Sequence, residues 1–449
     1  MGHLLKNTGD IGGKLIDGFL SATLITTSAE PFKNTMDRYH CDVKGNESVI
    51  TAEAIKNEFD TWLNLKPQVL IIRSLPNPKE KQFLRFNETP PPFFTNEALM
   101  YIYELDTPAV VIDLDVLEKN IEDMAALCRE LGITLRGHTK SHKSPEIAKM
   151  QVAAGSKGIV CQKLGEAENM ARAGLDDILI TYNIVGRQKV RRLTELARYR
   201  RITVTVDSFA IASGISEQAK LDRVTIGILV EIDTGGKRTG VQSPAAAEEL
   251  GKQVQTLPGL ELRGLMTYPS RVSSKPIIED VVGRFKKASL SLDIISGGGT
   301  GEEWESKELG FTEHRSGSYV YEGLSRIQGS SGNEGLSAER CPLRVITTVV
   351  SVPTEDRLIV DGGMKTFRLF PSMPYGLILE DPGIKFSGMS VEHGHVDTSE
   401  SNRKYIVGDK LTVIPTYQEG VTNLHDEIVW ARNDQVYRVL RNHGRGKVK

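Results

Sequence analysis

The stretch Ile133-Thr134-Leu135-Arg136-Gly137-His138-Thr139-Lys140-Ser141-His142-Lys143 decides the fold of this 449-residue chain. It begins as a short β-branched segment, runs into a polar cluster, and is followed by a helical segment over residues 145–154. A strand that leads into a helix is the unit of an α/β protein, in which ligands bind at the carboxyl ends of the strands. Lys140 therefore lies where a ligand is expected, although an ordinary surface lysine is the alternative for any one lysine.

Segments typical of strands and helices alternate on both sides of this stretch. A helix is expected over residues 114–131 because its apolar residues recur at helical spacing. Strands are expected over residues 107–113, 133–139, 158–162, 178–182, 202–207, 225–232, 260–268, 292–296 and 313–320, and further helices over 164–173, 188–199, 244–255 and 278–290. The eight strands from residue 133 onward predict a (β/α)8 TIM-type barrel. A doubly wound open sheet is the alternative, but no strand here leads into a Gly-x-Gly-x-x-Gly turn.

Three regions of the α/β chain are expected. Residues 1–102 form an N-terminal extension of unassigned role, with one helical pattern over 52–65. Residues 103–340 form the barrel, and residues 341–449 form a C-terminal β-domain with strands over 343–351, 357–360, 410–415 and 427–431. We expect the first strand, residues 107–113, to join the β-domain.

Composition narrows the class of protein. The net charge is only −2, so nothing indicates a surface for nucleic acid. No apolar run approaches the roughly twenty residues that span a membrane, and the amino terminus lacks the layout of a secretory signal. The four cysteines lie far apart, without the paired spacing of a zinc site or a disulfide framework. We expect a cytoplasmic protein with a small-molecule ligand.

Polar residues collect at the carboxyl ends of the expected barrel strands. The glycine-rich turns 296–300 and 315–319 follow the last two strands, where such barrels often bind phosphate. Glycine lets backbone N–H groups approach an anion closely, although a plain flexible turn is the alternative. Lys140 lies across the barrel mouth from these turns. A lysine opposite a phosphate cradle is what pyridoxal phosphate requires.

The chain from about residue 107 onward resembles the fold-type III pyridoxal-phosphate enzymes, specifically the D-threonine aldolase and D-serine dehydratase group related to alanine racemase. The matching motifs are Asp106-Thr107-Pro108-Ala109, Arg136-Gly137-His138-Thr139-Lys140-Ser141-His142-Lys143, Glu231-Ile232-Asp233-Thr234-Gly235, Arg238-Thr239-Gly240-Val241, Arg263-Gly264-Leu265-Met266-Thr267-Tyr268, Ser296-Gly297-Gly298-Gly299-Thr300, Arg315-Ser316-Gly317-Ser318-Tyr319, Asp361-Gly362-Gly363-Met364-Lys365, Glu392-His393-Gly394 and Asn423-Leu424-His425-Asp426. These motifs occur in the same order as in the family, and together they span most of the chain.

The resemblance implies roles for individual residues. Lys140 is implied to be the lysine that forms the imine with the cofactor, with Lys143 and Lys163 as competing lysines, and Arg238 to contact the polar edge of the cofactor ring. The residues expected to bind the cofactor are His138, Lys140, Tyr182, Arg238, Ser296, Gly298, Gly299, Thr300, Gly317, Ser318 and Tyr319.

The chain departs from the family at the metal-binding pair. Most relatives use a histidine and a cysteine or aspartate two residues apart, but this sequence has Tyr417 and Glu419 there. Glu419 is a weak candidate metal ligand, and Mg²⁺ or Mn²⁺ would suit its hard oxygen. Relatives often carry a histidine shortly after Tyr268, and this chain does not. The expected catalytic residues are therefore Lys140, Tyr268, Tyr417 and Glu419.

The resemblance predicts a lyase that cleaves or forms the Cα–Cβ bond of β-hydroxy D-amino acids, as D-threonine aldolases do. Dehydration of D-serine or of 3-hydroxy-D-amino acids, and amino-acid racemisation, are the enzymatic alternatives. A non-catalytic pyridoxal-phosphate carrier is the alternative from another class, but single-barrel carriers lack the β-domain expected here. The resemblance also implies a homodimer, because in this fold type the β-domain of one subunit covers the barrel mouth of the other.

Overall fold

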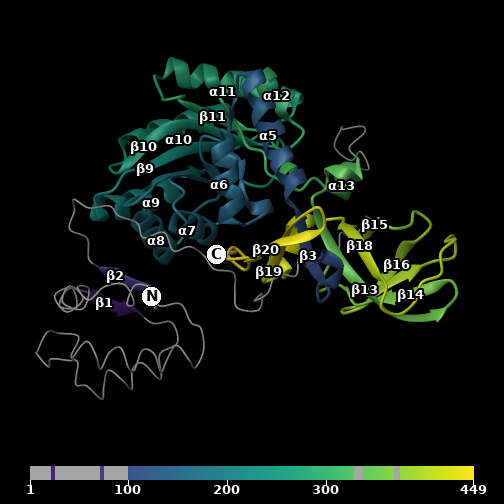
Figure 1. The fold of residues 1–449 in the computed structure, drawn as a ribbon. Coiled ribbons are helices and arrows are strands. Elements are labelled where there is room, and N and C mark those ends of the chain that lie inside the picture. The colour runs from purple at the N-terminus through teal and green to yellow at the C-terminus, as the bar shows by residue number, and fades with distance from the viewer. Residues whose placement is uncertain (1–21, 26–70, 75–99, 328–336, 369–374) are drawn as a thin grey trace, which may run out of the picture. The chain divides into compact units, whose positions relative to one another are not determined.

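The computed structural model describes residues 22–25, 71–74, 100–327, 337–368 and 375–449 (Figure 1). The chain divides into two compact units, residues 1–93 and 94–449. In the first unit, β1 (Ala22–Ile25) pairs antiparallel with β2 (Ile71–Ser74). The helix predicted over residues 52–65 lies outside the described residues.

The second unit contains a closed parallel barrel. Its strands are β4 (Thr134–Leu135), β5 (Gly137–His138), β6 (Ile159–Cys161), β7 (Asp177–Ile180), β8 (Arg201–Val206), β9 (Ile226–Asp233), β10 (Leu260–Tyr268), β11 (Ile294–Gly297) and β12 (Glu313–His314). β4 and β5 are two halves of one strand, interrupted at Arg136. Because β4 pairs with β12 and β5 pairs with β6, the ring closes with eight strands. This confirms the predicted fold class.

Helices cover the outside of the barrel (Figure 1). They are α5 (Leu114–Leu131), α6 (Pro145–Ala154), α7 (Leu164–Arg172), α8 (Arg187–Ala197), α9 (Phe209–Asp222), α10 (Pro244–Thr256), α11 (Lys275–Lys287) and the short α12 (Glu303–Glu308). Proline opens α6 and α10, and the hydroxyls of Ser144 and Ser243 accept hydrogen bonds from backbone N–H groups in the first turns. These serines therefore set where the two helices begin.

The last barrel strand is shorter than predicted. A strand was expected over residues 313–320, but β12 ends at His314 and the 3-10 helix η4 spans Ser318–Val320. The N–H groups of Tyr321 and Glu322 both donate to the carbonyl of Ser318. These local bonds, next to the polar and glycine residues 315–317, turn the chain out of the sheet.

Residues after 341 form the β-domain around a strand from the start of the second unit. β3 (Ala109–Asp113) pairs antiparallel with β13 (Leu343–Thr354) and parallel with β19 (Glu427–Arg432). The other strands are β14 (Arg357–Val360), β15 (Gly376–Ile378), β16 (Lys385–Met389), β17 (Gly394–Asp397), β18 (Lys410–Pro415) and β20 (Gln435–Arg441). β15, β16, β17 and β20 were not predicted, and the first three are short and carry or adjoin glycine.

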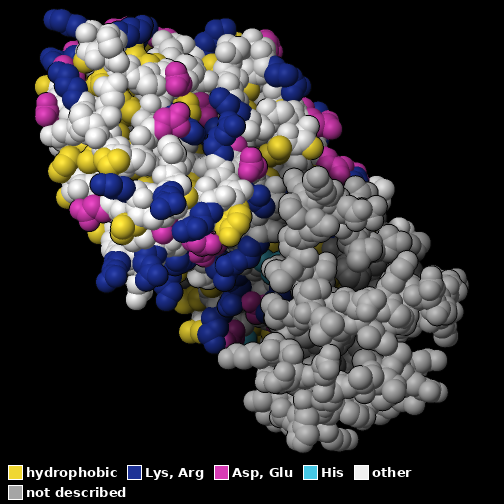
Figure 2. Space-filling model, turned by 90° about the vertical axis from the view of Figure 1, so that its left-hand side faces the viewer, with side chains coloured by type: hydrophobic (Ala, Val, Ile, Leu, Met, Phe, Trp, Pro, Cys, Tyr) yellow, Lys and Arg dark blue, Asp and Glu magenta, His cyan; other side chains and the backbone are white. Residues whose placement is uncertain are grey.

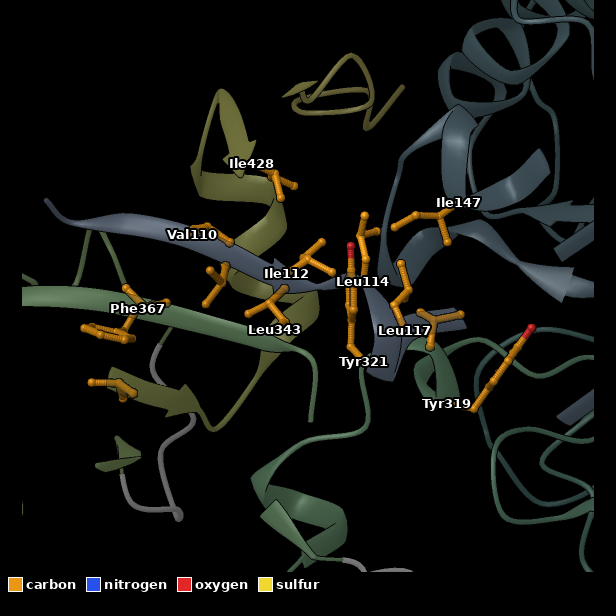
Figure 3. Close-up of a cluster of buried hydrophobic side chains, with 14 of the residues drawn as sticks. Val110, Ile112, Leu114, Leu117, Ile147, Tyr319, Tyr321, Leu343, Phe367 and Ile428 are labelled. Atoms are coloured by element: carbon orange, nitrogen blue, oxygen red, sulfur yellow. The ribbon is translucent and has the colours of Figure 1, made fainter. Parts of the chain in front are cut away.

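One hydrophobic core joins the barrel to the β-domain (Figure 3). Ile112 of β3 and Leu343 of β13 pack in the same cluster as Leu117 of α5 and Ile147 of α6, and all four are fully buried. Such burial is worth roughly 1.5–3 kcal/mol for each side chain. The core therefore holds the β-domain at a defined place beside the barrel.

Several charged side chains on the barrel helices are paired with neighbours of opposite sign. On the face in Figure 2, Lys and Arg side chains are frequent, with Asp and Glu side chains between them. Arg192 of α8 contacts Glu168 of α7 at 2.7 Å, and Arg198 contacts Asp222 of α9 at 3.1 Å. No helix within the described ranges is long and apolar enough to cross a membrane.

Candidate active site

Lys140 lies on the 3-10 helix η2 (Thr139–Ser141), which follows β5 at the barrel mouth. Its neighbours Thr139 and Ser141 are fully buried, and the Thr139 hydroxyl donates to the carbonyl of Val160 at 3.0 Å. The Lys140 side chain, by contrast, is 45% exposed. The turn is thus held in place from below while its lysine amine remains accessible.

A carboxylate from the β-domain lies beside this amine. Glu419 belongs to the short helix α14 (Gln418–Leu424), which packs on η2. Its Oε1 lies 3.9 Å from Lys140 Nζ and accepts a 2.7 Å hydrogen bond from the Ser141 hydroxyl. The Thr422 hydroxyl donates to the carbonyl of Ser141 at 3.0 Å and ties the two elements together. Residues nearly 280 positions apart therefore form one site.

Tyr417 completes this cluster from the residue before α14. Its phenol donates to Glu419 Oε2 at 2.8 Å. Burial raises the pKa of Tyr417 well above its usual range, and the neighbouring Glu419 raises it further. The phenol therefore keeps its proton at neutral pH and serves as a donor to the carboxylate.

The two glycine-rich turns are joined to each other. The Thr300 hydroxyl oxygen accepts hydrogen bonds from the N–H groups of Gly317 at 3.3 Å and Tyr319 at 3.2 Å. It also lies 2.8 Å from the Ser316 hydroxyl oxygen. The turns after β11 and β12 consequently form a single polar backbone surface next to η2.

Two glycines in these turns have no room for a side chain. Gly298 has a φ of +77°, and a Cβ there would lie 2.3 Å from Nδ1 of His314. A Cβ on Gly317 would lie 2.9 Å from Cβ of His138. The Gly298 N–H donates to the Ser270 hydroxyl at 2.8 Å, which fixes the first turn. Close backbone approach of this kind suits the binding of a phosphate group.

Buried polar residues lie inside the barrel beneath the mouth. Ser296, predicted to bind the cofactor, is fully buried, and its hydroxyl donates to Glu313 at 2.7 Å and accepts from Arg315 at 3.0 Å. Burial lowers the pKa of Arg315 to about 10 and holds that of His138 well below its usual value. Arg315 thus stays charged and His138 neutral near pH 7. No role was predicted for Arg315, although it begins the motif Arg315-Ser316-Gly317-Ser318-Tyr319.

Arg238 and Lys163 pair as cations with the aromatic rings of Tyr268 and Tyr182, whereas the ring of Tyr319 lies in the core. The Arg238 guanidinium is 5.0 Å from the ring centre of Tyr268, and both side chains are exposed at the mouth. The Lys163 amine lies 3.5 Å from the ring centre of Tyr182 and lowers the pKa of that phenol. Tyr319 contributes only its backbone, because its ring is buried in the core (Figure 3).

Lys143, one of the competing lysines, is not available at the mouth. It is buried, and its amine forms an ion pair with Glu166 at 3.1 Å. Within the part of the chain that the structure describes, no three His, Cys, Asp or Glu residues come together as a metal-binding group. The neighbours of the Glu419 carboxylate are the Ser141 hydroxyl, the Tyr417 phenol and the Lys140 amine.

Comparison with known proteins agrees with this geometry. Residues 112–325 match the family described as alanine racemase, N-terminal domain, and residues 342–431 match the "Putative serine dehydratase domain". A D-threonine aldolase of Arthrobacter sp is 32% identical over 82% of this chain and 99% of its own length. A 3-hydroxy-D-aspartate aldolase of Paracoccus denitrificans (strain Pd 1222) is 32% identical over 77% of this chain and 93% of its own length.

Solved structures show the same relationship. The crystal structure of D-threonine aldolase from Filomicrobium marinum superposes with a TM-score of 0.73 at 28% identity, covering 79% of this chain and 100% of that chain. D-threo-3-hydroxyaspartate dehydratase from Delftia sp. HT23 gives 0.68 at 26% identity, covering 76% and 98%.

The barrel and the fused β-domain define the class of alanine racemase-like enzymes. Within that class, the chain belongs to the D-threonine aldolase and D-serine dehydratase family of fold-type III enzymes. Its close relatives are aldolases and dehydratases, so the protein is an enzyme of the lyase class. Pyridoxal phosphate is the cofactor that this family implies.

Proposed function

We propose that this lyase breaks or forms the Cα–Cβ bond of β-hydroxy D-amino acids, with Lys140 carrying pyridoxal phosphate and Glu419 accepting the proton of the substrate hydroxyl. The observation that carries the proposal is the 3.9 Å separation of Lys140 Nζ and Glu419 Oε1. It puts a carboxylate base beside the lysine that would hold the substrate through the cofactor. The relatives named as D-threonine and 3-hydroxy-D-aspartate aldolases supply the reaction class.

The residues present fit the cofactor. The turns 296–300 and 315–319, which Gly298 and Gly317 keep free of side chains, would hold the phosphate. Lys140 would bind the aldehyde carbon, and Arg238 would contact the ring edge. When bound, pyridoxal phosphate supplies an electron-accepting ring that stabilises negative charge at Cα. The protein's own task is to orient the bond to Cβ and to move protons.

The proton transfers follow from the Glu419 cluster. Glu419 takes the proton of the β-hydroxyl, the C–O bond becomes a carbonyl as Cα–Cβ breaks, and the released aldehyde carries the former Cβ. The electron pair of the broken bond stays on Cα, which takes up a proton to give glycine. Tyr417 and Ser141 hold the carboxylate in place through hydrogen bonds of 2.8 and 2.7 Å.

Product identification tests the proposal. Incubating the holoenzyme with D-threonine should yield glycine and acetaldehyde in equal amounts. Dehydration is the second candidate, favoured by the 28% identity to the D-threo-3-hydroxyaspartate dehydratase of Delftia sp. (strain HT23), and would yield 2-oxobutanoate and ammonia. Formation of L-allo-threonine alone would show racemisation. Either of these results would overturn the aldolase assignment.

Assembly and location extend the proposal. We expect a cytoplasmic homodimer in which the partner's β-domain adds residues to a mouth that already receives Tyr417 and Glu419 from its own chain. The described cysteines, Cys128, Cys161 and Cys341, are buried free thiols, as in a reducing compartment. Light scattering of the active holoenzyme should give twice the mass of the chain, and a monomeric mass would contradict the dimer.

A further inference from the structure

Arg368 lies against the turn that carries Tyr417 and Glu419. A Cβ placed on Gly420 would lie 2.2 Å from Cβ and 2.4 Å from Cγ of Arg368, so the arginine stem occupies the space that this glycine leaves open. The segment before it is anchored, because Phe367 is fully buried in the core and the carbonyl of Thr366 lies 3.1 Å from Nε2 of His425. The position of Arg368 beside α14 is therefore built into the fold.

The charge of Arg368 acts on the same cluster. Burial and Glu419 raise the pKa of Tyr417, and the Arg368 guanidinium opposes that rise. The side chain is exposed, and among the described residues it forms no ion pair. Lys365 from the same segment, by contrast, is paired with Glu392 at 2.5 Å. Arg368 is thus a cation at the edge of the site whose charge the described acidic residues do not neutralise.

The chemistry of the substrate places its second substituent near this cation. In the proposed reaction Glu419 contacts the hydroxyl group on Cβ. The second substituent is bonded to the same Cβ atom, so it lies close to that hydroxyl. In D-threonine the group is a methyl, and in 3-hydroxy-D-aspartate it is a carboxylate. Two other cations at the mouth contact aromatic rings. Lys163 lies over the ring of Tyr182, and Arg238 lies over the ring of Tyr268.

We infer that Arg368 binds a carboxylate on Cβ, so that the enzyme prefers 3-hydroxy-D-aspartate and similar acidic substrates over D-threonine. The inference rests on the proposed function and names the substrate class of the same site. A guanidinium presents paired N–H donors that match a carboxylate, whereas it has nothing to offer a methyl group. Overall similarity does not decide between the two substrates, because relatives named for each are 32% identical to this chain.

Steady-state kinetics with both substrates test the role of Arg368. Arg368→Met should lower kcat/KM for 3-hydroxy-D-aspartate by roughly 10- to 100-fold, the loss expected for a hydrogen bond to a charged group. The value for D-threonine should change by less than about threefold, because that substrate lacks the second charge. Arg368→Lys should restore part of the loss. Lys365→Met is the matched control, and it should leave the ratio of the two substrates unchanged.

Binding separates this inference from the reaction itself. D-Aspartate and D-2-aminobutyrate lack the β-hydroxyl and differ only in the group on Cβ, so neither can undergo aldol cleavage. Calorimetric titration of the holoenzyme should show that Arg368→Met weakens the binding of D-aspartate by about the same 10- to 100-fold. The affinity for D-2-aminobutyrate should be nearly unaffected. Equal losses for both ligands, or none, would overturn the assignment of Arg368. A wild-type enzyme that binds D-aspartate through Arg368 but cleaves neither β-hydroxy substrate would overturn the proposed function alone.

Discussion

At the scale of single residues, Glu419 is the group on which the site depends. Its two carboxylate oxygens accept hydrogen bonds from Ser141 and Tyr417, and the Lys140 amine lies next to the same oxygen as Ser141. A carboxylate that is bonded by donors on two sides is held in one orientation. It is therefore positioned before the substrate arrives.

Replacing Lys140 tests the site of cofactor attachment. Lys140→Ala should lose the visible absorbance of the lysine-bound cofactor and nearly all activity, since no other amine occupies its position at the end of β5. Absorption spectra of the variant mixed with pyridoxal phosphate provide the measurement. Lys163→Ala is the control and should keep the band. Loss of the band in Lys163→Ala but not in Lys140→Ala would show that Lys140, at the end of the first barrel strand, is not the lysine that binds the cofactor.

Replacing Glu419 tests proton transfer against metal binding. If Glu419 is the base, Glu419→Gln should lower kcat by about 10²- to 10⁴-fold, and a strong chelator should leave the wild type active. Tyr417→Phe should have a smaller effect, because it removes only one donor to the carboxylate. Turnover that stops with chelator and returns with Mg²⁺ or Mn²⁺ would instead make Glu419 a metal ligand. If both variants kept nearly the wild-type kcat, neither Glu419 nor Tyr417 would take part in the mechanism.

At the scale of elements, the two glycine-rich turns act as one unit because Thr300 bonds to the backbone of the second turn. Gly298→Ala should disturb both, since its Cβ would overlap the buried ring of His314 and its φ of +77° disfavours a side chain. We expect pyridoxal phosphate to bind at least about tenfold more weakly, equivalent to about 1.4 kcal/mol. Equilibrium dialysis of cofactor from the folded variant measures this.

A second glycine provides the matched control for this prediction. Gly283 lies within α11, and no atom lies within 4 Å of a Cβ added there. Gly283→Ala should therefore stabilise the helix by roughly 0.5–1 kcal/mol and leave cofactor affinity unchanged. Equal cofactor retention in Gly298→Ala and Gly283→Ala would contradict the role of the first turn.

At the scale of the whole molecule, stability should fall as the solution is acidified. His142 is fully buried behind Lys140, where its Nδ1 accepts from the Ser144 N–H and its Nε2 lies 3.2 Å from Gln151 Oε1. Burial lowers its pKa to about 4, against 6.5 for an exposed histidine. Between these values the unfolded chain binds a proton that the folded chain does not, so the free energy of unfolding decreases as pH falls from 6.5 toward 4.

Urea unfolding at pH 7.5 and pH 5 measures this loss. His142 alone accounts for up to about 3 kcal/mol over the full range. His142→Asn should be less stable at pH 7.5 but lose less on acidification than the wild type. His393→Asn, which alters an exposed imidazole, should keep the wild-type slope. A slope that His142→Asn leaves unaltered would assign the acid sensitivity to other groups.

The secondary structure of the barrel was predicted well because it depends on local pattern. α5 and α6 have the predicted bounds, and β10 spans the predicted residues 260–268. The misses lie where local pattern is weak or misleading. β15, β16 and β17 have three to five residues each, and the segment after His314 contains β-branched and aromatic residues but turns through hydrogen bonds to Ser318.

Only part of the candidate site could be proposed from the sequence, for a physical reason. Lys140 and the glycine-rich turns could be assigned from sequence, because strand ends of a parallel barrel meet at one face. Ser141 could have been suspected only from its place next to Lys140, and nothing in the sequence pointed to Arg368. Ser296 and the ring of Tyr319 turned inward, since their partners Glu313 and Gln151 lie in the interior.

The sequence by itself determined the alternation of strands and helices, the glycines that alone fit the two turns, and the lysine at the end of the first barrel strand. These features follow from side-chain periodicity and backbone sterics, which act over a few residues. Only the tertiary structure decided that Glu419 lies beside Lys140 and that Arg368 lies beside Tyr417. Those contacts depend on how the shared core docks the β-domain against the barrel, and such docking is a property of surfaces that no local pattern encodes.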